Sequence, residues 1–195
     1  MMPPGLADLL YWITVIALAV ATLGTVIVAT WLKKNDLITI AAGLLSVDLV
    51  LAAFPVAGRL PTIGILLGVL SLAISVLGGG LAATYALRLA TRGSVPSGIH
   101  GGILVAADDD DSDHTPPRHE VLRGGTTIGY LERVAVTASL IAGFPEAIAV
   151  IIAIKGVGRF TELAAAEARE RFIIGTLASL IWACASAALV LLSGN

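Results

Sequence analysis

Long, nearly uncharged apolar runs dominate the pattern of hydrophobic and polar positions along this chain. Each run has about the 20 residues that a helix needs to cross ~30 Å of hydrocarbon at ~1.5 Å per residue. The pattern therefore predicts an all-α integral membrane protein with five transmembrane helices. These are expected at about residues 9–31, 37–57, 61–87, 134–154 and 172–192.

The polar segments between the runs predict how the chain is organised. A stretch rich in Gly, Pro, Ser and Asp, residues 93–129, separates a three-helix part, residues 1–92, from a two-helix hairpin, residues 130–195. This stretch has too little apolar surface to offset the entropy of ordering it, so we expect an acidic flexible linker. A short interfacial helix at about residues 162–171 is expected to form a charged elbow between the last two spans.

Composition supports a membrane protein and excludes several function classes. The chain is 57% hydrophobic and 13% charged, whereas soluble domains are about a quarter charged. A net charge of -2 without a clustered basic surface argues against nucleic-acid binding. No phosphate-binding Gly loop, zinc spacing or nucleophile beside a base is present, so we expect neither an enzyme nor a cofactor.

Membrane type and orientation follow from residue usage and from the positive-inside rule. The abundance of Ala, Val, Gly and Asp with few Lys suggests a bacterial protein, and hence the inner membrane. Five crossings divide the 12 Lys and Arg residues seven against five between the two faces. Because the more positive face is usually cytoplasmic, we expect a cytoplasmic linker and an N-terminus outside.

Two acids inside apolar runs are candidates for proton or cation chemistry. Asp48 and Glu146 each lie just past the middle of a predicted span, at nearly the same depth. A carboxylate at that depth costs several kcal/mol unless it is protonated, hydrated or bound to a cation. Structurally, a neutral acid can instead hydrogen-bond Ser or Thr on a neighbouring helix, and both interpretations stay open.

Small residues at four-residue spacing predict how the helices pack. Inside a bilayer, helix contact depends on close backbone approach at such residues and on interhelical hydrogen bonds. These rows of small residues indicate a compact bundle, or alternatively an interface between two copies of the chain. The main packing candidates are Gly64, Gly68, Gly143, Gly175 and Ser179.

The linker contains one candidate metal site. Four acids, Asp109, Asp111, Asp113 and Glu120, stand at positions 1, 3, 5 and 12 of a calcium-loop spacing. The fit fails at position 6, where the sharp turn needs Gly and the chain has His114. We therefore favour solvated acids over a calcium site.

The C-terminal third is the most patterned part of the chain. It reads Gly129-Tyr130-Leu131-Glu132-Arg133, then Lys155, then Arg159-Phe160 with Glu162, and then Ile174-Gly175-Thr176 with Ser179. This order resembles the C-terminal hairpin of an uncharacterised family of bacterial integral membrane proteins, over about 65 residues and not the first 128. The resemblance implies a membrane hairpin and brings no activity with it.

Charged residues of this pattern predict an interfacial role. Arg133 is expected to anchor the start of the fourth span at the headgroups, and Lys155 to neutralise that helix's C-terminal carbonyls. In this interpretation Arg159 faces lipid phosphates, and Glu162 offsets part of the positive charge. The charged elbow that contacts lipid or a partner protein then consists of Glu132, Arg133, Lys155, Arg159 and Glu162.

These observations favour a small accessory or scaffold subunit that acts through helix packing. Its expected surroundings are the lipid bilayer and a second membrane protein or a second copy of the chain. The alternative is a small proton- or cation-coupled transporter or channel that uses Asp48 and Glu146.

Overall fold

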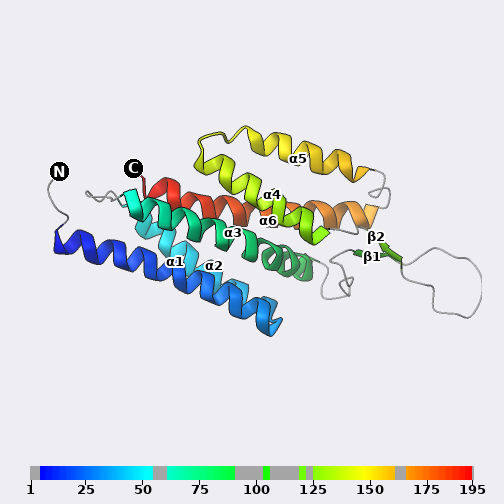
Figure 1. Cartoon of the computed structure of the whole chain (residues 1–195). Helices are drawn as coiled ribbons and strands as arrows, with labels where there is room; N and C mark the ends of the chain where they lie inside the picture. The colour runs from blue at the N-terminus through cyan, green and yellow to red at the C-terminus, as the bar shows by residue number, and fades with distance from the viewer. Residues whose placement is uncertain are drawn as a thin grey trace, which may run out of the picture.

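The computed structural model describes residues 5–54, 61–90, 103–105, 119–121, 125–160 and 166–194. These residues form a helical bundle with a small antiparallel ribbon beyond one end (Figure 1). The elements are α1 (Leu6–Leu32), the 3₁₀ helix η1 (Asn35–Leu37), α2 (Ile38–Ala52), α3 (Pro61–Ala90), β1 (Ile103–Val105), β2 (His119–Val121), α4 (Gly125–Ile141), α5 (Ala147–Gly158) and α6 (Ala166–Leu192).

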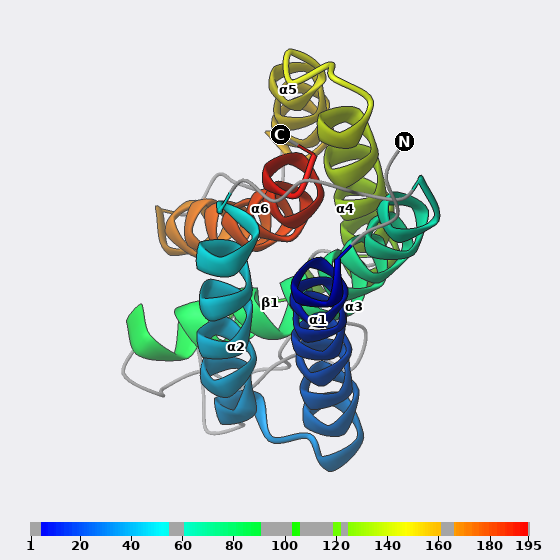
Figure 2. The same cartoon turned by 90° about the vertical axis from the view of Figure 1, so that its left-hand side faces the viewer.

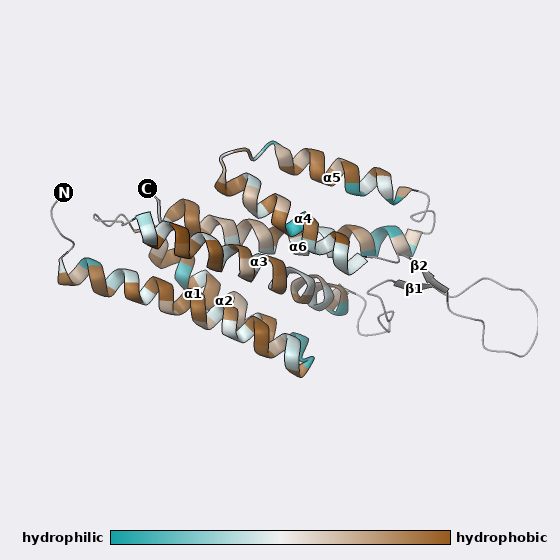
Figure 3. Ribbon diagram, viewed as in Figure 1, coloured by the Kyte–Doolittle hydropathy of each residue, from teal (hydrophilic) through white to brown (hydrophobic). Residues whose placement is uncertain are grey.

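Four helices are long and apolar enough to cross a membrane: α1, η1 with α2, α3 and α6. Their ribbons are mostly hydrophobic along their length, and hydrophilic positions gather where α1 ends and α6 begins (Figure 3). The sequence-based prediction of an all-helical membrane protein is confirmed to this extent. The helices α1, α3 and α6 contain the predicted spans 9–31, 61–87 and 172–192, whereas α2 ends at Ala52, short of the predicted end of its span at residue 57.

The fourth predicted span, residues 134–154, is wrong as a single helix. The chain reverses between α4 and α5, which lie antiparallel to each other (Figure 1). Thr137 of α4 donates a hydrogen bond to Ser75 of α3, and α4 ends at Ile141, only ~6 Å further along. From Ser75, α3 continues back to Pro61, ~21 Å away. The α4–α5 hairpin, as we call these two helices, therefore begins and ends at the same end of the bundle.

The break has a local cause in Gly143 and Pro145. Gly143 has φ +81°, a left-handed conformation in which glycine commonly ends a helix. The Phe144 N–H then donates to the Ser139 carbonyl at 2.8 Å, which closes the turn. Pro145 has no N–H to offer the next helical hydrogen bond and disfavours helical geometry at Phe144. Apolar residues on both sides thus form two short helices.

The predicted interfacial elbow also differs from the structure. Residues 166–171 are the first turns of α6 rather than part of a separate interfacial helix. Glu162 lies outside the described residues, as do the linker acids Asp109, Asp111 and Asp113. Glu120 belongs to β2, where it pairs with Leu104 in the backbone register, and its side chain is outside the described part.

The centre of the bundle is the α3–α6 interface. The Trp182 indole donates to the Ile74 carbonyl at 2.9 Å, and the Ser71 hydroxyl donates to the Ser186 carbonyl. Both bonds join residues more than 100 positions apart in the sequence. In the end view, α1 and α2 lie on one side of this pair, whereas α4 lies on the other with α5 outermost (Figure 2). The N-terminal and C-terminal membrane parts therefore form one bundle.

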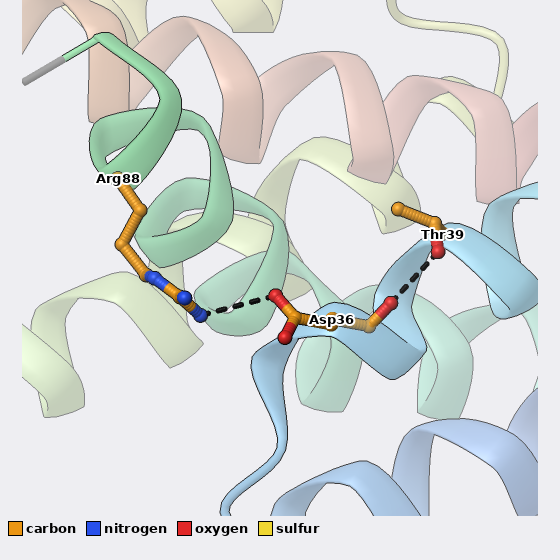
Figure 4. Close-up of polar contacts among 3 residues, drawn as sticks. All are labelled: Asp36, Thr39 and Arg88. Carbon is orange, nitrogen blue, oxygen red and sulfur yellow. Dashed lines mark hydrogen bonds and ion pairs between the residues drawn. The ribbon is translucent and has the colours of Figure 1, made fainter. Parts of the chain in front are cut away.

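A surface ion pair ties the turn between α1 and α2 to the end of α3. Arg88 of α3 donates to Asp36 of η1 at 3.1 Å, and the Thr39 hydroxyl donates to the Asp36 carbonyl (Figure 4). α1 ends just before, at Lys33, which has φ 52°. The C-terminal ends of α1 and α3 thus meet at the end of the bundle where α6 begins.

Candidate functional site

A cavity of about 360 Å³, lined by cationic, polar and apolar side chains, opens at this end of the bundle. Its walls come mainly from α3, α4 and α6, and α1 and α5 contribute one or two residues each. Four of its lining side chains are cationic: Arg133, Lys155, Arg159 and Arg171. The three arginines are only 6%, 9% and 8% exposed, respectively.

Arg133 lies deepest and is held by both neighbouring helices. Its Nε donates to the Val76 carbonyl of α3 at 3.0 Å, and its Nη1 donates to the Ser179 hydroxyl of α6 at 3.2 Å. The guanidinium carbon lies 5.1 Å from the ring centre of Tyr130, within the range of a cation–π contact. The sequence-based prediction of a headgroup anchor is therefore wrong for Arg133, because the side chain points into the bundle.

Two glycines make room for this packing. A Cβ at Gly79 would collide with Cδ of Arg133, and a Cβ at Gly78 would collide with the Trp182 indole. The Arg133 side chain therefore crosses α3 at a point where only glycine fits. Gly129, one turn earlier on α4, leaves 3.2 Å between an added Cβ and Nη1 of Arg133.

Lys155 joins the two helices of the hairpin. It forms an ion pair with Glu132 of α4, and both side chains are largely buried. Its ammonium also lies 5.7 Å from the ring centre of Phe172 on α6. Lys155 thus contacts an acid and an aromatic ring on two other helices. It also stands in the last turn of α5, near the C-terminal carbonyls that the sequence predicted it to neutralise.

Arg171 of α6 also lines the cavity. Its Nη2 pairs with Glu167, one turn earlier on the same helix, and Glu167 is mostly exposed. Its buried Nε has no hydrogen-bond partner among the described residues. Two carboxylates, on Glu132 and Glu167, thus form ion pairs with two of the four cations.

The structure brings the patterned C-terminal residues together in one place. Most positions that carry the family resemblance line this cavity, although they are spread over 50 residues of sequence. They are Gly129, Tyr130, Arg133, Lys155, Arg159, Gly175, Thr176 and Ser179. Glu132 joins them through Lys155, whereas Phe160 is exposed.

Sequence reasoning missed the part that α3 plays in this site. Val76 bonds to Arg133 and Gly79 leaves space for it, and neither residue is among the candidates named from the sequence. The signal that was present is the Gly78-Gly79-Gly80 triplet, since three glycines within a helix are costly unless something packs closely against them.

The two intramembrane acids lie in different surroundings. Asp48 is fully buried on α2, and neither of its carboxyl oxygens has a hydrogen-bond partner among the described residues. Glu146 lies in the turn before α5 and is exposed, so its predicted place within a helix is wrong. The two carboxyls do not form a hydrogen-bonded pair.

The structure places some of the predicted packing residues at helix contacts and others away from them. Ser179 is buried against α4, and a Cβ at Gly175 would lie 3.5 Å from Leu87 of α3. Gly143 is in the turn rather than on a packing face, and a Cβ at Gly68 would have no atom within 4 Å. Gly64 is partly buried on α3.

Comparisons of the chain with protein-family models, with curated proteins and with solved structures found no match. Among the described residues, no three His, Cys, Asp or Glu side chains gather where they could hold a metal ion. The chemistry of the cavity is therefore argued from its own side chains. Buried guanidinium and ammonium groups around one cavity suit a ligand with a phosphate or another oxyanion.

Proposed function

We propose that this chain is a bacterial inner-membrane protein that binds a phosphate-bearing ligand in the cationic cavity. The observation that carries the proposal is the burial of three arginines around one cavity, with Lys155 beside them. Arginine is suited to such a site because its planar fork of donors matches the oxygens of a phosphate.

Energetics support an anionic occupant. Burying a charge is costly unless it is paired and hydrogen-bonded. Glu132 and Glu167 pair with Lys155 and Arg171. The buried Nε of Arg171 still has no hydrogen-bond partner among the described residues. A bound phosphate offers several acceptor oxygens, and this would offset part of the desolvation cost of the cluster.

The distribution of charge supports a cytoplasmic mouth for the cavity. Of the eight Lys and Arg residues in the described part, seven belong to the end of the bundle where the cavity opens; they are Lys33, Lys34, Arg88, Lys155, Arg159, Arg169 and Arg171. The eighth, Arg133, lines the same cavity but bonds to Val76, about halfway along α3. The α4–α5 hairpin is responsible, because it returns the end of α5 to the face that holds the start of α6 and the α1–α2 turn. The positive-inside rule then favours this face as cytoplasmic and the start of α1 as external.

A titration with glycerol phosphate, followed by ³¹P NMR of the purified protein, tests the proposal. Arg159→Gln and Arg171→Gln should each weaken binding about 10- to 100-fold, the worth of a charge-assisted hydrogen bond. Arg88→Gln is the matched control, because Arg88 lies at the same end but outside the cavity. Equal losses in all three variants, or no saturable binding by the unmodified chain, would contradict the proposal.

A second candidate, the accessory subunit that acts through helix packing, is favoured by the tip of the hairpin. α5 has no buried residue, and the turn before it exposes Phe144 and Glu146 short of the far end of the bundle. Irregular, charged chain at membrane depth is normally covered by protein or water. Cysteine crosslinking from position 144 in native membranes tests this role, and adducts with lipid alone would contradict it.

The transporter alternative has weaker support. It drew on two acids at one depth, and only Asp48 remains buried within a helix. A conducting or coupled role for Asp48 predicts that Asp48→Asn abolishes proton or cation flux in proteoliposomes, whereas a packing role predicts no flux in either protein.

A further inference from the structure

A second hollow, of about 420 Å³, lies along the outer side of the hairpin between α4 and α5. Its walls are mainly apolar, from Ile128, Leu131, Ala135, Ile151 and Ile154. Leu131 and Ile154 are 66% and 68% exposed, so the groove lies open at the surface of the bundle. On a membrane-spanning bundle, that surface faces lipid chains.

The groove and the cationic cavity adjoin. Ile128, Lys155 and Arg159 line both of them. Lys155 and its partner Glu132 mark the boundary, with apolar side chains on one side and the arginine cluster on the other. A single ligand that occupies both spaces must therefore carry an anionic end and a hydrocarbon end.

We infer that the ligand is an anionic phospholipid whose phosphate lies in the cationic cavity and whose acyl chain lies in the α4–α5 groove. This inference rests on the proposed function, since it names the substrate class of the same site. Charge complementarity selects an anionic over a zwitterionic headgroup. The apolar groove selects a lipid over a free phosphate, because each buried methylene contributes ~0.8 kcal/mol.

Access to the site follows from the position of the hairpin. α5 is outermost in the bundle (Figure 2), and α4 is the helix that it contacts most. A lipid reaches the groove sideways from the bilayer, without passing through the tightly packed α3–α6 interface. The headgroup then lies at the end of the bundle that carries the basic residues, the side on which clusters of Lys and Arg meet lipid headgroups.

The test compares chain length and headgroup in a single protein. Purified protein is titrated with dibutyryl-phosphatidylglycerol, dioleoyl-phosphatidylglycerol and dioleoyl-phosphatidylcholine, and bound lipid is counted by native mass spectrometry. The long-chain anionic lipid should bind at least about tenfold more tightly than either of the others. Ala135→Trp, which fills the groove, should abolish the preference for the long chain and leave glycerol phosphate binding unchanged.

Ala138→Trp is the matched control, because Ala138 is exposed on the same helix but does not line the groove. Equal binding of the short and long chains, or an Ala135→Trp variant that behaves like Ala138→Trp, would overturn the chain's place in the groove while phosphate binding stands. Equal binding of phosphatidylcholine and phosphatidylglycerol would overturn the choice of an anionic lipid. Failure of the unmodified chain to bind glycerol phosphate would instead remove the proposed function.

Discussion

A single glycine on α3, Gly79, leaves the space in which the Arg133 side chain is buried. Arg133 crosses α3 at Gly79 and bonds to the Val76 carbonyl, so the absence of one Cβ on α3 places a guanidinium inside the protein. Asp48 presents the opposite case, because it is buried without any hydrogen-bond partner among the described residues. Arg133 therefore has hydrogen-bond partners on two neighbouring helices, whereas the burial of Asp48 lowers the stability of the fold.

Gly79→Ala should destabilise the protein by about 1–3 kcal/mol, because the new methyl group collides with Arg133 Cδ. Gly68→Ala on the same helix should instead stabilise it by about 0.5–1 kcal/mol, since nothing lies within 4 Å of the new Cβ and alanine favours helix. Thermal unfolding in detergent measures both. Similar shifts for the two variants would show that Arg133 does not pack on Gly79.

Asp48→Leu should raise the free energy of unfolding by about 1–3 kcal/mol, because it removes a buried carboxyl that lacks hydrogen bonds. Asp48→Asn serves as the comparison, since it keeps a polar group of the same shape and should change stability less. A strongly destabilised Asp48→Leu protein would indicate that the carboxyl has a partner.

At the scale of elements, the hairpin separates what the sequence could predict from what it could not. The four long helices were predictable because an unbroken apolar run of 20 residues has few other stable structures in a chain of this composition. The turn at Gly143 and Pro145 was not, since its flanks are as apolar as a helix and hydropathy does not record a change of direction. Pro145 was visible in the sequence, but proline is also tolerated within spanning helices.

The candidate site shows the same limit. The patterned residues from Gly129 to Ser179 could be selected from sequence, but their common location depends on the reversal before α5. Arg133 precedes an apolar run and therefore resembled an interfacial anchor. Only the opposing glycine of α3, far away in sequence, makes its burial possible.

The Glu132–Lys155 ion pair should hold α5 to α4. Glu132→Gln and Lys155→Met should each cost about 3–5 kcal/mol, because each leaves a largely buried charge without its partner. The double variant should cost clearly less than the sum of the two. Chemical unfolding of all four proteins gives this coupling, and strictly additive losses would contradict a buried pair.

For the whole molecule, the α4–α5 hairpin predicts that both ends of the chain lie on the same side of the membrane. In a Cys184→Ala background, cysteines replacing Leu6 and Gly194 should be labelled from outside the cell, because both exposed positions lie at the end away from the cationic cavity. Cysteines replacing Lys34 and Phe160 should react only from the cytoplasm. Labelling of Leu6→Cys and Gly194→Cys from opposite sides would restore the five-span arrangement.

The central claim is that the cationic cavity holds the phosphate of an anionic ligand. A crystal structure grown in a lipidic mesophase doped with phosphatidylglycerol tests it most directly. The account predicts phosphate density within hydrogen-bond distance, about 3 Å, of at least two of the arginines Arg133, Arg159 and Arg171. A cavity filled with water alone, with lipid phosphates ordered elsewhere on the surface, would contradict it.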